Sequence, residues 1–165
     1  MVASTPCPLC SNPGGELLWQ DDLCRVVLIA HGDEAYFPGY CRVIWNVHIG
    51  EMSDLTTSQA QHLMDIVVRV EYVLRQTVQA DKINLASLGN MTPHVHWHII
   101  PRWRDDSHFP ASTWAAALRP ICPRQELTQE QWRQLSTQLS TQLSRQLASR
   151  LQTELPGSHP SLFAQ

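Results

Sequence analysis

The chain has 165 residues, 43% of them hydrophobic, and a formal net charge of −3 at pH 7, which is ordinary for one globular domain with a sizeable core. The slightly acidic balance excludes the basic footprint of a protein that binds a nucleic acid polymer. No apolar run reaches the roughly 18 residues that a membrane-spanning helix requires, so we expect no membrane partner.

The first motif is a Cys-x-x-Cys pair, Cys7 and Cys10. The five cysteines are an odd number, and no basic segment followed by an apolar one opens the chain, so we expect the reducing cytoplasm and no disulfide framework. There, such a pair is half of a zinc site, a redox motif or two inert thiols. Turn residues at 11–15 follow it, whereas a redox pair normally precedes a helix, which favours zinc with two further ligands.

Three stretches in the first third of the chain have the composition of β-strands. They are a short one at 16–20, an apolar run at 24–30 and another at 40–47. Turn residues separate the last two, so antiparallel pairing is the simplest topology. His48 directly follows the third stretch, where a lone histidine matters only if the cysteine pair lies nearby.

A long helix is predicted next, from the capping residues at 54–58 to about Ala80. Its core face is given by side chains that recur at spacings of three and four: Leu63, Ile66, Val67, Val70, Val73, Leu74 and Thr77. His62 and Glu71 are expected to lie off that face.

Three alternating histidines form the most informative stretch, within Pro-His-Val-His-Trp-His-Ile-Ile-Pro-Arg at 93–102. The composition predicts a half-buried strand with a proline at each boundary. Because side chains alternate between the two faces of a strand, His94, His96 and His98 point to one face, and the apolar residues between them point into a core.

The histidine face allows three interpretations from these residues. In the first, the histidines belong to a polar face and form hydrogen bonds with neighbouring groups. In the second, they hold a catalytic zinc ion that keeps an open ligand position. Alternatively, one imidazole attacks phosphorus while its neighbours hold the phosphoryl oxygens. A strand at 82–88 and the turn Gly89-Asn90 precede the histidines, so a hairpin would bring Asn84 and Asn90 to the same surface.

Two segments follow the histidine strand. Residues 103–123 predict an irregular segment that crosses the histidine face, where aromatic side chains either stack on a base or cover the sheet. From Thr128 to about Leu155, leucine recurs every fourth residue, which predicts a long helix whose apolar stripe drifts by about 40° per step. We expect its first part to pack on the domain and its glutamine-rich later part to fray or bind a partner.

The run from His94 to Ile100 resembles the signature of the histidine triad (HIT) superfamily of nucleotidyl hydrolases and transferases. The resemblance covers roughly residues 6–110, including the cysteine pair, the helix and the hairpin. It implies an α+β fold with an antiparallel sheet of about five strands and one main helix, to which the long C-terminal helix is added. The expected organisation is a catalytic domain at 1–123, an amphipathic helix at 124–156 and a flexible tail at 157–165.

The resemblance also implies roles for individual residues. The middle histidine, His96, would be the nucleophile, and His98 would bind the phosphoryl group. In members with the cysteine pair, a structural zinc ion takes four ligands, whose positions here are Cys7, Cys10, His48 and His94. Two cysteines and two histidines close a tetrahedral site and leave no position for water.

Further positions match those that the family places near ribose and phosphate: Asn84 and Asn90, with Asp33 as a candidate for the ribose hydroxyls. We therefore expect a nucleotide hydrolase that acts at the α-phosphate of dinucleoside polyphosphates or nucleoside phosphoramidates through a nucleotidyl-histidine intermediate. Since many members of the family are homodimers, we also expect a homodimer. Two alternatives remain: a metal-dependent enzyme with catalytic zinc on the three histidines, and a non-catalytic nucleotide-binding protein.

Overall fold

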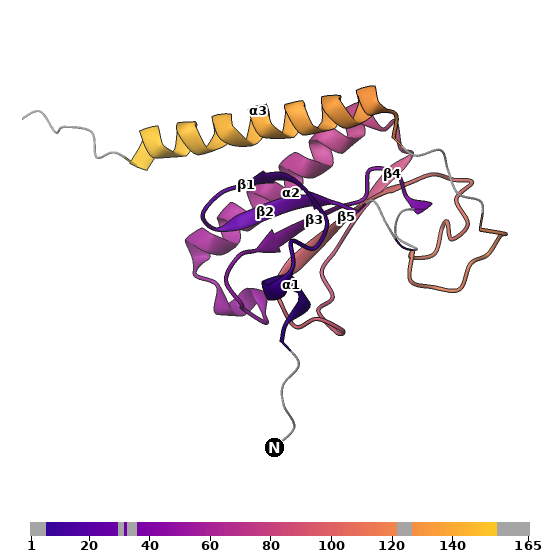
Figure 1. Cartoon of the computed structure of the whole chain (residues 1–165), viewed down its shortest axis with the longest axis horizontal. Helices are drawn as coiled ribbons and strands as arrows, with labels where there is room; N and C mark the ends of the chain where they lie inside the picture. Colours follow the sequence, from indigo (N-terminus) through magenta and orange to yellow (C-terminus); the bar gives the residue numbers. More distant parts are fainter. Residues whose placement is uncertain (1–5, 30–31, 33–35, 122–126, 155–165) are drawn as a thin grey trace, which may run out of the picture.

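A computed structural model describes residues 6–29, 32, 36–121 and 127–154, and for 146–154 only the course of the backbone. Asp33 and the predicted tail at 157–165 lie outside the described residues. The described residues form a five-stranded antiparallel sheet with the order β1-β2-β3-β5-β4 (Figure 1), whose strands are β1 (Glu16–Gln20), β2 (Cys24–Leu28), β3 (Cys41–Trp45), β4 (Lys82–Ala86) and β5 (His96–Arg102). The predicted α+β fold is thus confirmed, as are the antiparallel pairings β2–β3 and β4–β5.

Among the described residues, four helical segments accompany the sheet: α1 (Pro8–Ser11), the short 3-10 helix η2 (Met52–Asp54), α2 (Thr57–Thr77) and α3 (Gln129–Glu154). The start of α2 is a capping box, in which the Thr56 hydroxyl accepts from the Gln59 N–H and the Gln59 side chain accepts from the Thr56 N–H. Within the described part of the chain, no helix is both long and apolar enough to cross a membrane.

The main core lies between one face of the sheet and the two long helices. All seven side chains of the predicted α2 face are buried. Helix α3 runs beside α2 (Figure 1) and also contacts β1, and its Leu135, Leu139 and Leu143 are fully buried in the same core. Three successive leucines of the drifting stripe therefore reach this surface.

His62 departs from the expectation that it lies off the core face of α2. It is buried, and its Nε2–H donates to the Asp21 carboxylate at 2.8 Å. The same carboxylate accepts from the backbone N–H groups of Leu23 and Cys24. Burial alone would raise the pKa of Asp21, but these hydrogen bonds hold that pKa below its ordinary value. The sequence pattern missed this pair because Asp21 lies in the β1–β2 turn, far from His62 along the chain.

The opposite face of the sheet carries the histidines. Trp97 and Ile99 of β5 pack in the main core, so His96 and His98 point to the other side, as the alternation predicted. On that side, α1 and the segment after β5 lie over the strands, and a smaller apolar cluster lies beneath them: Leu9, Val27, Ile29, Phe37, Tyr40, Ile44 and Ile100.

Candidate active site

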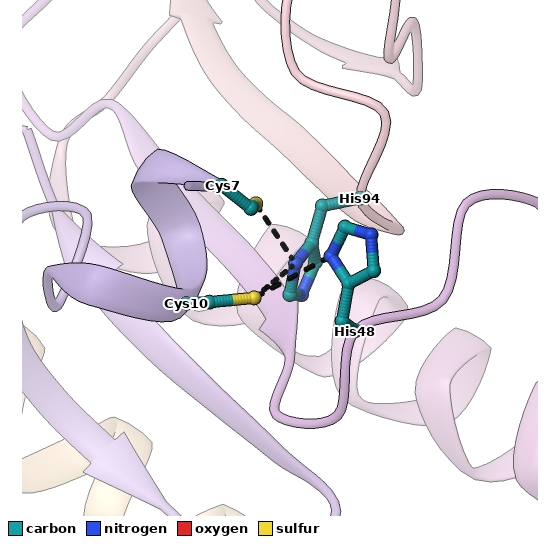
Figure 2. Close-up of side chains that lie close together, drawn as sticks. All are labelled: Cys7, Cys10, His48 and His94. Carbon is teal, nitrogen blue, oxygen red and sulfur yellow. Dashed lines mark hydrogen bonds between the residues drawn. The ribbon is translucent and has the colours of Figure 1, made fainter. Parts of the chain in front are cut away.

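Four metal-ligating side chains meet at the edge of the histidine face (Figure 2). Cys7 is the N-cap of α1 and Cys10 lies in its single turn, which Pro8 favours because its φ angle is preset for the first helical position. His48 follows β3 and His94 precedes β5. Their ligand atoms all lie within 4.8 Å of one another, so the structure brings together the four residues predicted to hold zinc.

The geometry of this cluster can be compared with that of zinc. The Nδ1 of His94 lies 3.5 Å from the Sγ of both Cys7 and Cys10, and the Nδ1 of His48 lies 3.4 Å from the Sγ of Cys10. Zn–S bonds of about 2.3 Å and Zn–N bonds of about 2.05 Å at tetrahedral angles place sulfur and nitrogen about 3.5 Å apart. The donor set and its spacing therefore fit one tetrahedral zinc ion.

The surroundings of the cluster hold its ligand atoms in position. The Nε2–H of His94 donates to the Trp45 carbonyl at 2.6 Å, which leaves the Nδ1 lone pair facing the thiols. Burial lowers the pKa of His94 and so favours the neutral ring that ligates metals. Arg25 on β2 donates to the carbonyls of Leu9 and Pro13, at 2.6 and 2.9 Å, and so ties α1 to the sheet.

His96 and His98 line a separate cavity of 370 Å³ on the same face, together with Asn90, Thr92 and other residues. The Nδ1–H of His96 donates to the His94 carbonyl at 2.6 Å. A neutral imidazole that donates at Nδ1 has its lone pair on Nε2, the atom available for attack. The His96 and His98 rings lie edge to face with centroids 4.7 Å apart.

The ring of His98 is held by Tyr40, whose phenol oxygen lies 2.6 Å from Nδ1. Burial first, and then the neighbouring His96 and Arg42, lower the pKa of His98 to about 3, so the ring is neutral at physiological pH. When the phenol donates to Nδ1, the proton of the neutral ring is on Nε2 and can be donated to a phosphoryl oxygen.

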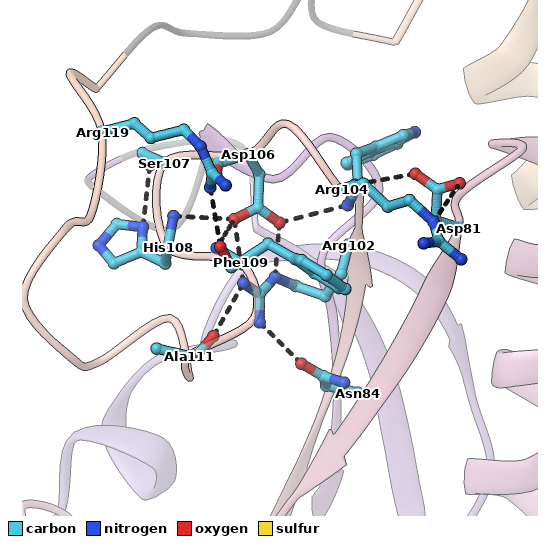
Figure 3. A network of polar contacts seen from close by, with 11 residues as sticks. Asp81, Asn84, Arg102, Arg104, Asp106, Ser107, His108, Phe109, Ala111 and Arg119 are labelled. Atoms are coloured by element: carbon cyan, nitrogen blue, oxygen red, sulfur yellow. Dashed lines mark hydrogen bonds and ion pairs between the residues drawn. The ribbon is translucent and has the colours of Figure 1, made fainter.

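The segment after β5 is anchored by a buried ion pair (Figure 3). The guanidinium of Arg102 is almost fully buried and donates to both carboxylate oxygens of Asp106, at 2.8 and 3.0 Å. Burial alone would raise the pKa of Asp106, but these bonds and two backbone N–H donors hold that pKa below its ordinary value. The anchor lets the following residues run back over the sheet, where Trp114 lies edge-on to His98 with ring centroids 5.1 Å apart.

The structure separates the residues predicted to contact the substrate. Asn90 lines the cavity of His96 and His98. Asn84 does not line it; its Oδ1 accepts from Arg102 at 2.8 Å, and it borders a neighbouring hollow of 520 Å³ along β4. Trp114 lines both spaces. The substrate roles of Asn84 and Asn90 stay predictions, and Asp33 lies outside the described residues.

Two residues of the site were not singled out from the sequence: Tyr40, which bonds His98, and Arg42, which lines the cavity. Both belong to the stretch predicted as a strand at 40–47, where alternation places them on one face. The missing information was which strand pairs with that stretch, because the antiparallel ladder puts Arg42 opposite His98.

Comparison with known proteins agrees with this arrangement. A family model, the HIT domain, matches residues 15–105, more than half of the chain. An AP-4-A phosphorylase of Mycobacterium tuberculosis is 25% identical over 111 residues, covering 64% of this chain and 55% of that protein. A bis(5'-nucleosyl)-tetraphosphatase (asymmetrical) of Schizosaccharomyces pombe is 34% identical over 74 residues, covering 42% of this chain and 41% of that protein. The chain thus spans about half the length, or less, of these curated relatives.

Solved structures share the fold. A histidine triad protein from Marinobacter aquaeolei VT8 matches with a TM-score of 0.62 at 25% identity, covering 86% of this chain and 96% of that one. A zinc-bound histidine triad family protein from Mycobacterium smegmatis matches with a TM-score of 0.57 at 21% identity, covering 88% and 97% of the two chains. With the family match over more than half its length, this chain belongs to the histidine triad (HIT) domain family.

Proposed function

We propose that the protein hydrolyses nucleotides at the α-phosphorus, with a dinucleoside polyphosphate or a nucleoside phosphoramidate as substrate. The observation that carries the proposal is the orientation of His96. Its Nδ1–H is held by the His94 carbonyl, and its ring lines a cavity beside a neutral His98. A neutral imidazole held in this way is a competent nucleophile and a tolerable leaving group, so the displacement can be divided into two steps.

In the first step, Nε2 of His96 attacks the α-phosphorus, an N–P bond forms, and the bond to the leaving group breaks with its electron pair. In the second step, a water oxygen bonds to phosphorus, the N–P bond returns its electrons to Nε2, and the proton passes to solvent. The nucleoside monophosphate is released. His98 and Asn90 would stabilise the charge on the phosphoryl oxygens throughout, because donors placed before the reaction need no reorganisation.

The curated relatives support the choice of substrate class. One is named for AP-4-A and the other for a bis(5'-nucleosyl) tetraphosphate, so a dinucleoside polyphosphate is the first candidate for this chain. Catalytic zinc on the three histidines finds less support. His94 faces the cysteines, and among the described residues no metal-ligating group includes His96 or His98.

We further propose a structural zinc ion on Cys7, Cys10, His48 and His94. When bound, zinc would supply a cross-link between α1, the end of β3 and the start of β5, with no ligand position for water. The Cys10 side chain is exposed, yet partial desolvation and the neighbouring Cys7 raise the pKa of its thiol, and zinc favours the thiolate because it replaces the proton. Since these thiols must stay reduced, we place the protein in the cytoplasm.

A homodimer is the remaining part of the proposal. Strand β4 is an edge of the sheet, and exposed apolar side chains lie on it and on the neighbouring α2: Val68, Tyr72 and Leu85. No other strand in the described part of the chain pairs with the outer edge of β4, and such an edge beside apolar side chains is a surface suited to pairing with a second copy. Light scattering should give twice the chain mass, and Leu85→Lys should shift the mass to that of one chain. A monomeric wild type would contradict this part alone.

The catalytic proposal can be tested by trapping the covalent intermediate. Rapid acid-free quench of the wild-type reaction with labelled diadenosine tetraphosphate should trap about one nucleotidyl group per site, on the peptide that contains His96. His96→Ala should show no trapped label and no turnover, yet bind adenosine monophosphate within about tenfold of wild type, because contacts to the base and ribose would not involve its imidazole. Near-normal turnover by His96→Ala would falsify the assignment of the nucleophile.

A further inference from the structure

A half-exposed tryptophan borders the histidines of the cavity. Trp114 lies on the segment after β5, and its ring lies edge to face with that of His98, with centroids 5.1 Å apart. Its side chain lines both the cavity of His96 and His98 and the neighbouring hollow along β4, and the residue is 46% exposed. Trp114 is therefore a wall that these two spaces share, and it remains open to a ligand in either of them.

The segment that carries Trp114 is held by hydrogen bonds on both sides of it (Figure 3). Before it, the guanidinium of Arg102 donates to the Ala111 carbonyl at 3.0 Å. After it, the guanidinium of Arg119 donates to the Phe109 carbonyl at 2.7 Å. The segment is thus positioned by its own polar contacts while the indole stays half-exposed. A side chain that is positioned before a ligand arrives loses less conformational freedom on binding.

The hollow along β4 continues the histidine face of the sheet. Asn84 lies opposite Ile100 in the β4–β5 ladder, opposite residues point to the same face, and both line this space of 520 Å³. Among the described residues that line it, the charged ones are Glu71 and Lys82, whose formal charges cancel. A ligand in the hollow would therefore be recognised by stacking and hydrogen bonds and not by a net charge.

The cavity of the histidines is small for a whole dinucleotide. Its 370 Å³ lie near the lower end of the roughly 300–1,000 Å³ that small-molecule sites span. When His96 attacks the α-phosphorus of a dinucleoside polyphosphate, the second nucleoside belongs to the leaving group. This half of the substrate has to extend out of the cavity, and the hollow adjoins the cavity at Trp114.

We propose that Trp114 stacks on the base of the leaving nucleotide and that the hollow along β4 receives this half of the substrate. The inference rests on the proposed function and narrows its substrate class, because a dinucleoside polyphosphate has a second base and a simple phosphoramidate has none. The face of an indole ring stacks on any nucleobase, and removal of such a ring weakens binding by about 10- to 100-fold.

Two ligands that differ by one nucleoside make this contact measurable. Diadenosine tetraphosphate has a second adenosine beyond its phosphates, and adenosine tetraphosphate lacks it. Adenosine monophosphate lacks the leaving group altogether. Loss of a stacking contact with the second base should therefore weaken the diadenosine compound and spare the other two.

The experiment compares wild type with Trp114→Ala, Trp114→Phe and a matched control, Leu118→Ala. Leu118 is an exposed apolar residue of the same segment and lines neither space. Trp114→Ala should lower kcat/KM for diadenosine tetraphosphate by about 10- to 100-fold. The kcat/KM for adenosine tetraphosphate and the calorimetric affinity for adenosine monophosphate should stay within about threefold of wild type. Trp114→Phe should recover part of the loss, since its smaller ring still stacks, and Leu118→Ala should match wild type.

Three results would overturn the inference: no loss on diadenosine tetraphosphate, an equal loss on both tetraphosphates, or a loss that extends to adenosine monophosphate. The second would place Trp114 against the phosphates, and the third would place it against the transferred nucleotide. Melting temperatures should show that the variants fold, and Trp114→Leu replaces Trp114→Ala if that protein does not, because leucine keeps bulk without an aromatic face.

The proposed function fails separately from this inference. If wild type never labels His96 and hydrolyses neither tetraphosphate, the calorimetric affinities of the two tetraphosphates for the same variants give the same comparison. A wild type that binds both equally well would then overturn the role of Trp114, and a preference for the diadenosine compound that Trp114→Ala removes would support it.

Discussion

The phenol oxygen of Tyr40 lies 2.6 Å from Nδ1 of His98, and both side chains are buried on the histidine face of the sheet. Tyr40 immediately precedes β3, and His98 lies within β5, so this hydrogen bond joins two neighbouring strands at the cavity. With the phenol as donor, it selects the neutral form of His98 whose proton is on Nε2, the atom that can donate to substrate. Tyr40 is therefore a positioning residue for His98.

Replacing Tyr40 with Phe tests that role, because the ring stays and only the hydroxyl is lost. We expect kcat to fall about fivefold with little change in KM, since one hydrogen bond contributes about 1 kcal/mol and acts through a group that serves the transition state. Nitrogen chemical shifts of His98 should show a mixture of tautomers in the variant and one tautomer in wild type. An unchanged kcat with an unchanged tautomer would show that the hydroxyl only fills space.

Removal of a zinc ligand should affect stability first. Purified wild type should hold about one zinc ion per chain, and Cys10→Ala should release it and lower the melting temperature by about 10 °C. Cys41→Ala is the matched control, because Cys41 is buried in the main core on β3 and should keep its zinc while losing some packing. Retained zinc and full stability in Cys10→Ala would contradict a structural site.

Truncation within α3 should separate its two parts. Removal of residues 144–165 leaves the buried Leu135, Leu139 and Leu143 in place, so folding and turnover should be nearly unchanged. Removal of residues 128–165 takes away all three, each worth about 2–5 kcal/mol in a core, and should abolish folding. Circular dichroism and turnover of the two proteins decide the matter. If the protein that lacks only residues 144–165 were insoluble or inactive, this segment would belong to the core or to a subunit interface.

The buried His98 should also contribute to the pH dependence of stability. Its pKa is lowered to about 3, first by burial, whereas in the unfolded chain it returns to its ordinary value near 6.5. Between these values the unfolded state holds one more proton, so the free energy of unfolding rises with pH by up to about 1.4 kcal/mol per unit, and the contribution is constant above about pH 7.

His98→Gln should remove this contribution. Urea unfolding of zinc-saturated protein from pH 5 to pH 8 should therefore show a smaller rise in the variant than in wild type, with the two slopes equal above pH 7. Equal slopes below pH 6.5 would mean that His98 titrates normally in the folded protein.

Periodic features of single elements could be predicted from the sequence. The shared face of His96 and His98 and the buried face of α2 follow from the repeats of a strand and of a helix, which are local and independent of the partner. The grouping of Cys7, Cys10, His48 and His94 was predicted only from resemblance to a family, since no local rule connects three distant segments. The structure brings the four ligand atoms together.

Relationships between strands were decided only by the tertiary structure. The β3–β5 register places Arg42 opposite His98, and the approach of Tyr40 to the same ring depends on that pairing. The buried Arg102 needs acceptors nearby, and Asn84, on the predicted hairpin, accepts a hydrogen bond from it. Asn84 therefore borders a different hollow from the one lined by the histidines. Register and the satisfaction of buried charges depend on the whole sheet, so no single stretch of sequence specifies them.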